Sequence, residues 1–140
     1  MNFREAKKED YDYFREHSRD PNFYKDAPEI QDFDYVLEHN GKPLVIGGLR
    51  LITKWTAWGW FDFSDEIGDN VIIAYRTIKE WMEISTKQLG IRRVMAWVEV
   101  GFEAGERTVV HLGFHKESRM HNFIDGRPAD LWVKFYGESE

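Results

Sequence analysis

The stretch that decides the fold runs from Val71 to Val100 and has the sequence VIIAYRTIKEWMEISTKQLGIRRVMAWVEV. In its first part, apolar side chains recur at spacings of three, four or seven residues, as in a helix that buries one face. They are Val71, Tyr75, Ile78, Met82 and Leu89. Gly90 follows, and glycine is common just past the end of a helix. We therefore expect a long helix that begins near Asp69 and ends at Leu89.

The last part of the stretch, Val94–Val100, is a nearly unbroken apolar run. Such a run is typical of a strand that is buried on both faces, as in a parallel pair. Ahead of the helix, the aromatic-rich segment Thr56–Phe63 also favours a strand. Parallel strands need a long connection, which the helix supplies. The sequence therefore predicts a β-α-β unit with a right-handed crossover.

Further elements lie on either side of this unit. Asn40-Gly41 and Asp125-Gly126 are strong signals for tight turns between antiparallel strands. Segment 20–32 holds several residues that break regular structure, and we expect a loop or a short helix there. The remaining predicted elements are strands over 2–6, 33–39, 43–51, 114–123 and 129–136, and helices over 8–19 and 103–112.

This element order predicts one compact α/β (α+β) domain that covers residues 1–140. The sheet should be mixed but mostly antiparallel, with helices on both faces. The length of 140 residues is typical of a single domain, and 42% hydrophobic residues are ample for one core.

Charge and composition argue against several classes of function. The formal net charge is −6 and the basic residues are scattered, so we expect no nucleic-acid partner. No segment is apolar enough to span a bilayer and the first residues lack the apolar stretch of a signal peptide, so we expect no membrane partner and a cytoplasmic location. The absence of cysteine excludes disulfides and thiolate catalysis.

The chain has six tryptophans, which is a large number for its length. Trp55, Trp58 and Trp60 lie close together in the sequence. The general burial tendency of tryptophan favours core filling and a strand surface. The alternative is an aromatic contact face for a protein partner, because tryptophan is enriched in interface hot spots.

The run from Asp69 to Phe114 resembles the GNAT acetyltransferases. The matching features are the long helix, the strand after it, and a short helix that ends His111-Leu112-Gly113-Phe114, similar to the family's leucine-glycine-phenylalanine ending. By element order the resemblance covers nearly the whole chain. Segments 40–48 and 97–101 are also similar to the small GNAT-like proteins of short-tailed bacteriophages, which implies a location in the host cytoplasm or the virion.

The resemblance implies acetyl-CoA as a cofactor, bound where the fourth and fifth strands separate. In the family, backbone amides of a glycine-containing loop before the long helix hold the pyrophosphate, because unpaired amides and the helix dipole stabilise an anion. Here that loop is Ser64–Asn70. The positions implied to bind the cofactor are Phe61, Asp62, Phe63, Gly68, Asp69, Asn70, Val71, Val100 and Phe102.

The loop departs from the family's pattern in its charge. Gly68 is its one candidate for a loop glycine, and the family's leading glutamine or arginine is absent. Asp65, Glu66 and Asp69 lie where the pyrophosphate would dock. Each like-charge pair at roughly 6 Å costs about 1 to 3 kcal/mol before salt screening. A structural interpretation of the same acids is capping of the long helix, which would neutralise its dipole.

Two further positions lack the residues that are frequent in the family. Val109 stands in place of a tyrosine that protonates the leaving thiolate of CoA, and Phe102 stands in place of an asparagine. Neither replacement can exchange a proton. Loss of acid catalysis slows a reaction by about a hundredfold or more without abolishing it.

A base would have to deprotonate the acceptor amine. Asp62 and Glu99, near the ends of two strands, are the main candidates, and Glu38 is a third. Asp62 alternates with aromatic residues, which predicts an ordinary solvent-facing strand position. Glu99 interrupts an apolar strand, and buried carboxylates are rare unless they are paired or functional. Its structural alternative is a strand end in water or an ion pair with Arg92 or Arg93.

Histidines give little indication of a metal site. His111 and His115 are four residues apart, but Gly113-Phe114 breaks the helix between them and no nearby carboxylate completes a ligand set. We therefore expect no metal.

Two functions are compatible with the sequence. The first is transfer of an acetyl group from acetyl-CoA to the amine of a small molecule or a protein. The second is a non-catalytic GNAT-like protein that acts as a virion or host-interaction component and binds a phage or host protein. The acidic loop, Val109 and Phe102 favour the second.

Overall fold

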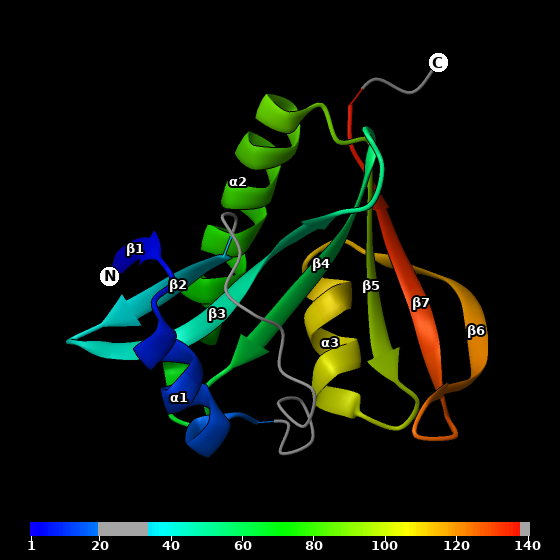
Figure 1. Ribbon diagram of the computed structural model, residues 1–140. Coiled ribbons are helices and arrows are strands. Elements are labelled where there is room, and N and C mark those ends of the chain that lie inside the picture. The colour runs from blue at the N-terminus through cyan, green and yellow to red at the C-terminus, as the bar shows by residue number, and fades with distance from the viewer. Residues whose placement is uncertain (20–33, 138–140) are drawn as a thin grey trace. The chain divides into compact units, whose positions relative to one another are not determined.

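The structure is a computed structural model, and it describes residues 1–19 and 34–137. Figure 1 shows the elements in chain order. They are β1 (Asn2–Glu5), α1 (Lys8–His17), β2 (Asp34–His39), β3 (Lys42–Leu51), β4 (Thr56–Phe63), η2 (Gly68–Asn70), α2 (Val71–Leu89), β5 (Arg93–Glu99), α3 (Glu103–His111), β6 (His115–Ile124) and β7 (Arg127–Phe135).

The elements predicted from the sequence are confirmed to within two residues at each end. The loop or short helix expected over 20–32 lies outside the described residues. The predicted first helix is two residues too long, because Ser18 has an extended backbone and forms an isolated bridge with Ser64.

The seven strands of the described residues form one sheet with the order β1-β2-β3-β4-β5-β7-β6. The pairs β1–β2, β2–β3, β5–β7 and β6–β7 are antiparallel, whereas β4 and β5 are parallel. The parallel ladder contains three residue pairs, from Thr56 with Arg93 to Trp58 with Met95. The predicted β-α-β unit and the mixed, mostly antiparallel sheet are therefore confirmed.

Both predicted hairpin turns are present. Asn40 and Gly41 have φ angles of 53° and 76°, and Asp125 and Gly126 have φ angles of 48° and 76°. Two successive positive φ angles define the turn whose twist matches antiparallel strands, and they explain why asparagine or aspartate followed by glycine occurs at each turn.

The chain consists of two compact units. Unit 1 comprises Met1–Arg50 and Gly59–Ala74, and unit 2 comprises Leu51–Trp58 and Tyr75–Glu140. β4 contributes its first residues to unit 2 and its last residues to unit 1. A single domain over residues 1–140 stays a prediction.

The core of unit 1 forms between α1 and its strands. Tyr11 and Phe14 lie three residues apart on α1 and pack with Val36 of β2 and Ile46 of β3. Val36 and Ile46 are opposite each other in the β2–β3 ladder, so they present their side chains to the same face of the sheet.

A buried charge lies beside this core. Asp34 of β2 is 1% exposed, and its carboxylate accepts hydrogen bonds from the Tyr11 hydroxyl and from the Arg50 guanidinium, which binds both carboxylate oxygens. Arg50 also lies over the Trp60 ring, 5.3 Å from the ring centroid. This network joins α1, β2 and β3, and the burial of Tyr11 together with its bond to Asp34 raises the pKa of that phenol.

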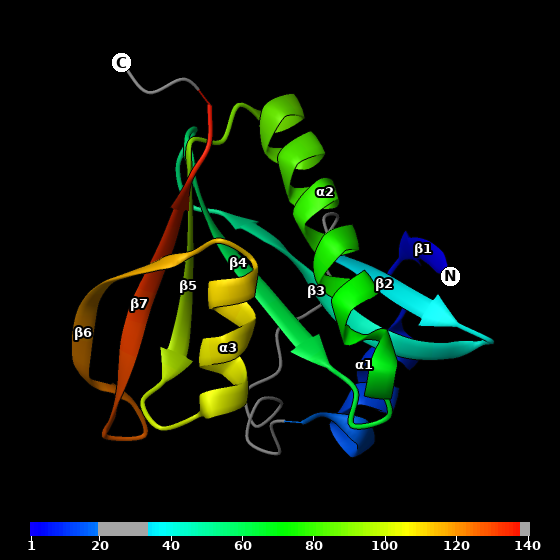
Figure 2. The same cartoon turned by 180° about the vertical axis from the view of Figure 1, so that it is seen from behind.

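In unit 2, β5 alternates between buried and accessible side chains. Val94, Ala96 and Val98 are buried, whereas Trp97 is 38% exposed and Met95 is half-buried. α3 lies against β5 (Figure 2). The expectation that β5 is buried on both faces is therefore wrong within the described residues, because the apolar side chains of Met95 and Trp97 stay accessible on one face.

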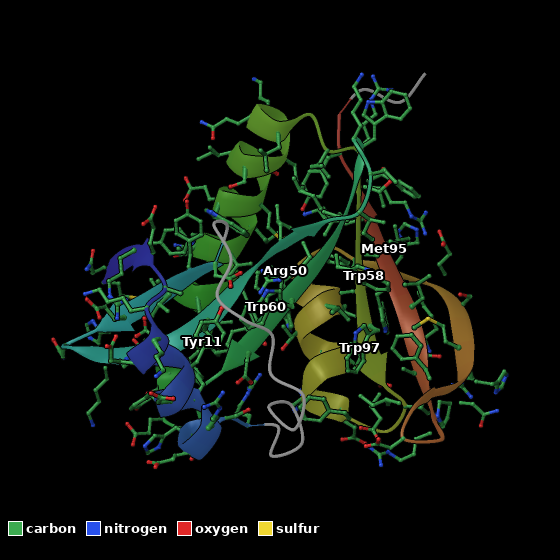
Figure 3. All side chains as sticks on the ribbon, in the orientation of Figure 1. Tyr11, Arg50, Trp58, Trp60, Met95 and Trp97 are labelled. Carbon is green, nitrogen blue, oxygen red and sulfur yellow. The ribbon has the colours of Figure 1, made fainter. Side chains whose placement is uncertain are left out.

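The tryptophans follow the core-filling prediction at one position. Trp132 is 7% exposed, whereas Trp55 is 55% exposed and Trp97 is also accessible. Trp58 and Trp60 are half-buried residues on β4, and Figure 3 shows Trp58, Met95 and Trp97 along β4 and β5 of unit 2. The interpretation as a strand surface holds better than the interpretation as core.

Among the described residues, no helix is both long enough and apolar enough to cross a membrane.

The Asp34 network yields a stability prediction. Asp34→Asn should lower the free energy of unfolding by about 3 to 5 kcal/mol, because it leaves the Arg50 guanidinium without its buried counter-charge. The measurement is urea denaturation. Asp12→Asn is the matched control, since Asp12 forms an exposed pair with Arg15, and it should change the value by less than about 0.5 kcal/mol. Equal effects of the two substitutions would contradict the role given to Asp34.

Candidate functional site

Segment Ser64–Asn70 connects β4 to α2 in unit 1, and hydrogen bonds of its backbone amides fix its position. The amide of Ser64 donates to the Leu44 carbonyl and that of Asp65 donates to the His17 carbonyl. The amide of Glu66 donates to the Ser64 hydroxyl, and the amides of Ile67 and Asn70 donate to carbonyls within the segment. Amides that the family resemblance assigns to a pyrophosphate are thus used inside the protein.

Two acidic residues of this segment, Asp65 and Glu66, have partners in unit 1. His17 Nδ1 lies 3.5 Å from Oδ1 of Asp65 and 3.7 Å from Oε1 of Glu66. The other oxygen of Glu66 accepts a hydrogen bond from the Tyr13 hydroxyl at 3.2 Å and lies 3.4 Å from Lys42 Nζ. The hydrogen bond from Tyr13 and the charge of Lys42 lower the pKa of the Glu66 carboxyl.

The predicted capping of the long helix by these acids is wrong for Asp65 and Glu66. The 3-10 turn η2 precedes α2 and has no side-chain cap, and the first turn of α2 contains no acidic residue. One reason is that the amide of Asn70 is already bonded to the Ile67 carbonyl. The other is that the carboxylates of Asp65 and Glu66 face His17 instead of the start of the helix. Asp69, the third acid, is exposed within η2.

Gly68 is an open position in the segment. Its φ is +51°, a conformation that favours glycine, and a Cβ built there would have no atom within 4 Å. Gly68, Asp69 and Asn70 form η2 and Val71 begins α2, and their role in cofactor binding stays a prediction.

The end of β4 carries the other predicted site residues of unit 1. Phe61 packs so closely on β3 that a Cβ at Gly47 would lie 2.5 Å from its ring, which explains the glycine at that position. Phe63 is buried, and the Arg19 guanidinium lies 4.6 Å from its ring centroid. Both aromatic rings are thus packed against the protein.

Asp62 differs from its prediction as a solvent-facing strand residue. It is 4% exposed, and its Oδ1 accepts a hydrogen bond from the Ser18 hydroxyl at 2.8 Å. The strand alternation failed here because the residues that follow α1 pair with the end of β4: the Arg19 amide donates to the Phe63 carbonyl, and Ser18 bridges Ser64.

Glu99 lies at the end of β5 in unit 2 and forms an ion pair with Arg127 of β7. The expected partners were Arg92 or Arg93, but Arg93 pairs with Glu117. The pairing of β5 with β7 explains the choice of partner. Glu99 is directly opposite Ala129 in this ladder, which brings its carboxylate close to Arg127, two residues before Ala129.

The third candidate base, Glu38, is also paired. It accepts hydrogen bonds from the Asn2 side chain and from the Arg4 guanidinium. Both bonds lower the pKa of its carboxyl.

The junction between β5 and α3 is closed by packing in unit 2. A Cβ at Gly105 would lie 2.7 Å from the Phe102 ring and 2.9 Å from Val98, so the ring fills the space above Gly105. The amide of Val100 donates to the Pro128 carbonyl, and Val109 is buried. Phe102 and Val109 therefore serve packing at the positions where the family often has polar residues.

The histidines of unit 2 do not form a pair. His111 stacks on Tyr75 with ring centroids 4.9 Å apart, and His115 lies beside Phe135. Sequence reasoning missed His17, which meets Asp65 and Glu66 although 48 residues separate His17 from Asp65. No motif spacing could have found this group, because the bridge between Ser18 and Ser64 creates it.

Known proteins were compared with the chain and its structure. No protein-family model matches, and no curated protein matches by sequence. The ribosomal-protein-S18-alanine N-acetyltransferase from Escherichia coli has a similar structure with a TM-score of 0.73 and 12% identity, over 99% of this chain and 96% of that one. A variant of the spermidine N-acetyltransferase from Vibrio cholerae is similar with a TM-score of 0.72 and 13% identity, over 96% of this chain and 95% of that one.

A third similar structure, yncA from Salmonella typhimurium, was solved with its cofactor acetyl-CoA. Its TM-score is 0.62 at 16% identity, over 76% of this chain and 65% of that one. At these identities the comparisons establish the fold, which is that of the GNAT acetyltransferases.

The packing at the start of α3 leads to a prediction. Gly105→Ala should lower the free energy of unfolding by about 1 to 3 kcal/mol, because the new methyl group overlaps Phe102 and Val98. Urea denaturation measures the effect. In a Phe102→Ala background the cost should shrink by about 1 kcal/mol or more, since two of the three closest contacts are with that ring. Additive effects of the two substitutions would show that the ring lies elsewhere.

Proposed function

We propose that this chain is a GNAT-type acyltransferase-like protein that transfers the acetyl group of acetyl-CoA to an amine. The observation that carries the proposal is the connection that begins at the short parallel ladder of β4 and β5 and runs through Gly68 into α2. The similar structures support it through the fold, and one of them was solved with acetyl-CoA. The acceptor is the amine of a small molecule or a protein.

In this proposal the pyrophosphate lies at the start of α2. The open position at Gly68 offers close approach to an anion beside the positive end of the helix dipole. Fewer amides are offered than in the family, because those of Ser64–Ile67 and Asn70 are bonded within the protein. Phe61, Asp62, Phe63 and Asn70 in unit 1, and Val100 and Phe102 in unit 2, are the further proposed cofactor contacts.

Asp62 and Glu99 remain the proposed bases. Asp62 is buried and hydrogen-bonded to Ser18, while the Glu99 carboxylate is held by Arg127 and half-buried. Either carboxylate would accept the proton of the acceptor ammonium group, directly or through water, before the nitrogen attacks the thioester. The nitrogen–acyl bond then forms as the carbon–sulfur bond breaks, and the leaving thiolate takes up the second proton of the nitrogen, directly or through water, so that the products are the acetylated amine and free CoA thiol.

A second function, a non-catalytic GNAT-like protein that binds a phage or host protein, is supported by specific observations. The amides of the segment are engaged, the Phe102 ring fills the β5–α3 junction, and Val109 is buried where a proton donor is frequent. The accessible Trp58, Trp97 and Met95 would supply its contact face.

Thermal unfolding with acetyl-CoA separates the two functions. A ligand at a hundred times its Kd adds about 2.7 kcal/mol to the stability. In a domain of this size, that should raise the Tm by several degrees. Unchanged Tm at millimolar acetyl-CoA would rule out the enzyme and favour the binding protein. If the Tm rises, release of free CoA thiol in the presence of spermidine or an N-terminal peptide tests for transfer.

The pairing of the acids predicts which substitution improves cofactor binding. Asp69→Asn should tighten acetyl-CoA binding several-fold, because it removes an exposed charge that is worth about 1 to 3 kcal/mol at roughly 6 Å before screening. Asp65→Asn is the matched control and should have a smaller effect, since that carboxylate faces His17. Calorimetric titration measures both. A larger gain from Asp65→Asn would place the phosphates away from η2.

A further inference from the structure

Three potential metal ligands converge in unit 1. His17 supplies an imidazole nitrogen from the end of α1, and Asp65 and Glu66 supply carboxylate oxygens from the segment after β4. The three ligand atoms all lie within 4.8 Å of one another. His17 Nδ1 is the common neighbour, at 3.5 Å from Asp65 and 3.7 Å from Glu66. Neither α2 nor its dipole takes part in this group.

The spacing of these atoms suits one small cation. Bonds of about 2.1 Å from zinc to nitrogen and oxygen place neighbouring ligands of a tetrahedron about 3.4 Å apart. The distances from His17 are within a few tenths of an ångström of that spacing. Both carboxylate side chains are exposed, so small rotations can bring their oxygens to bonding distance from the cation. A water molecule can provide the fourth ligand.

The neighbouring side chains orient the ligands. The Tyr13 ring stacks on His17 with ring centroids 4.3 Å apart, which holds the imidazole against α1. Oε1 of Glu66 faces His17, while its Oε2 accepts a hydrogen bond from the Tyr13 hydroxyl and forms an ion pair with Lys42. One carboxylate oxygen therefore remains available toward the imidazole, and partners that orient a ligand in this way commonly strengthen metal binding.

We propose that His17, Asp65 and Glu66 bind a divalent transition-metal cation, with Zn²⁺ as the preferred ion. One imidazole and two carboxylates match the ligands of Zn²⁺, whereas Mg²⁺ favours oxygen ligands alone and retains its waters. The site lies beside the segment that the proposed function assigns to the pyrophosphate but does not depend on that function. A bound cation would replace the net negative charge of Asp65 and Glu66 by a neutral or positive centre.

Calorimetric titration of the untagged full-length chain with ZnCl₂ near pH 7.5, without CoA, tests the site. The expected result is one Zn²⁺ per chain. His17→Ala, Asp65→Asn and Glu66→Gln should each weaken binding by about tenfold or more, since each removes one of three protein ligands. Tyr13→Phe should weaken it by about tenfold, because the hydroxyl that orients Glu66 is lost.

Two matched controls keep the result specific. Asp69→Asn removes an acid of the same segment that is outside the group, and His115→Ala removes a histidine of unit 2. Both should bind Zn²⁺ as the parent chain does. Absence of stoichiometric binding by the parent chain, or equal binding by all variants, would overturn the proposal and leave His17 as a polar neighbour of the two carboxylates.

Misfolding of a variant would not obscure the test. Titration of the parent chain with Co²⁺ should produce visible absorption bands of a nitrogen- and oxygen-ligated ion, and Zn²⁺ should remove them. A tenfold excess of Mg²⁺ should leave them unchanged. Failure of Co²⁺ to give such bands would count against the site, whatever the outcome with acetyl-CoA.

Discussion

The parallel pairing of β4 with β5 is the constraint on which the rest of the structure depends. Two neighbouring strands that run in the same direction cannot be joined by a tight turn, so the chain must leave the end of β4 and return to the start of β5. α2 makes that return, and its length of 19 residues allows it to do so. The segment Ser64–Asn70 exists because the chain has to change direction before the helix begins. Its position at a helix entrance is therefore a product of topology, and any anion-binding capacity is secondary to that.

Two demands compete for the backbone of this segment. Structural order requires its amides to be bonded, and anion binding requires amides that are free to face a ligand. Here the first demand is met for Ser64–Ile67 through Leu44, His17 and the segment itself. The same contacts fix the end of α1 to the end of β4. The rigidity of unit 1 and a generous phosphate-binding loop thus cannot both be obtained from the same four amides, and the open conformation at Gly68 is what remains for a ligand.

Patterns in the sequence predicted the elements because those patterns are local. The stripe from Val71 to Leu89 and the two turn dipeptides express preferences of a few adjacent residues, and the structure follows them. Partners of charged residues depend on pairing between distant segments, so they could not be predicted. Asp62 was expected in solvent but lies against Ser18, and Glu99 pairs with Arg127 of a neighbouring strand. The apolar run of β5 predicted a strand buried on both faces, and this was wrong because Trp97 and Met95 are apolar residues at accessible positions.

The acids of the Ser64–Asn70 segment show why net charge is a poor guide to what a site can bind. Counted along the sequence, Asp65, Glu66 and Asp69 give three negative charges before a helix. In the structure, Asp65 and Glu66 face His17, and Glu66 also faces Lys42. Coulomb energy falls with distance and with solvent screening, so a carboxylate beside a cation acts on a third charge mainly as part of a dipole. The Glu66 carboxylate beside Lys42 therefore repels an anion at the entrance to α2 less than the exposed Asp69 does, and the dipole of α2 stays available to oppose that repulsion.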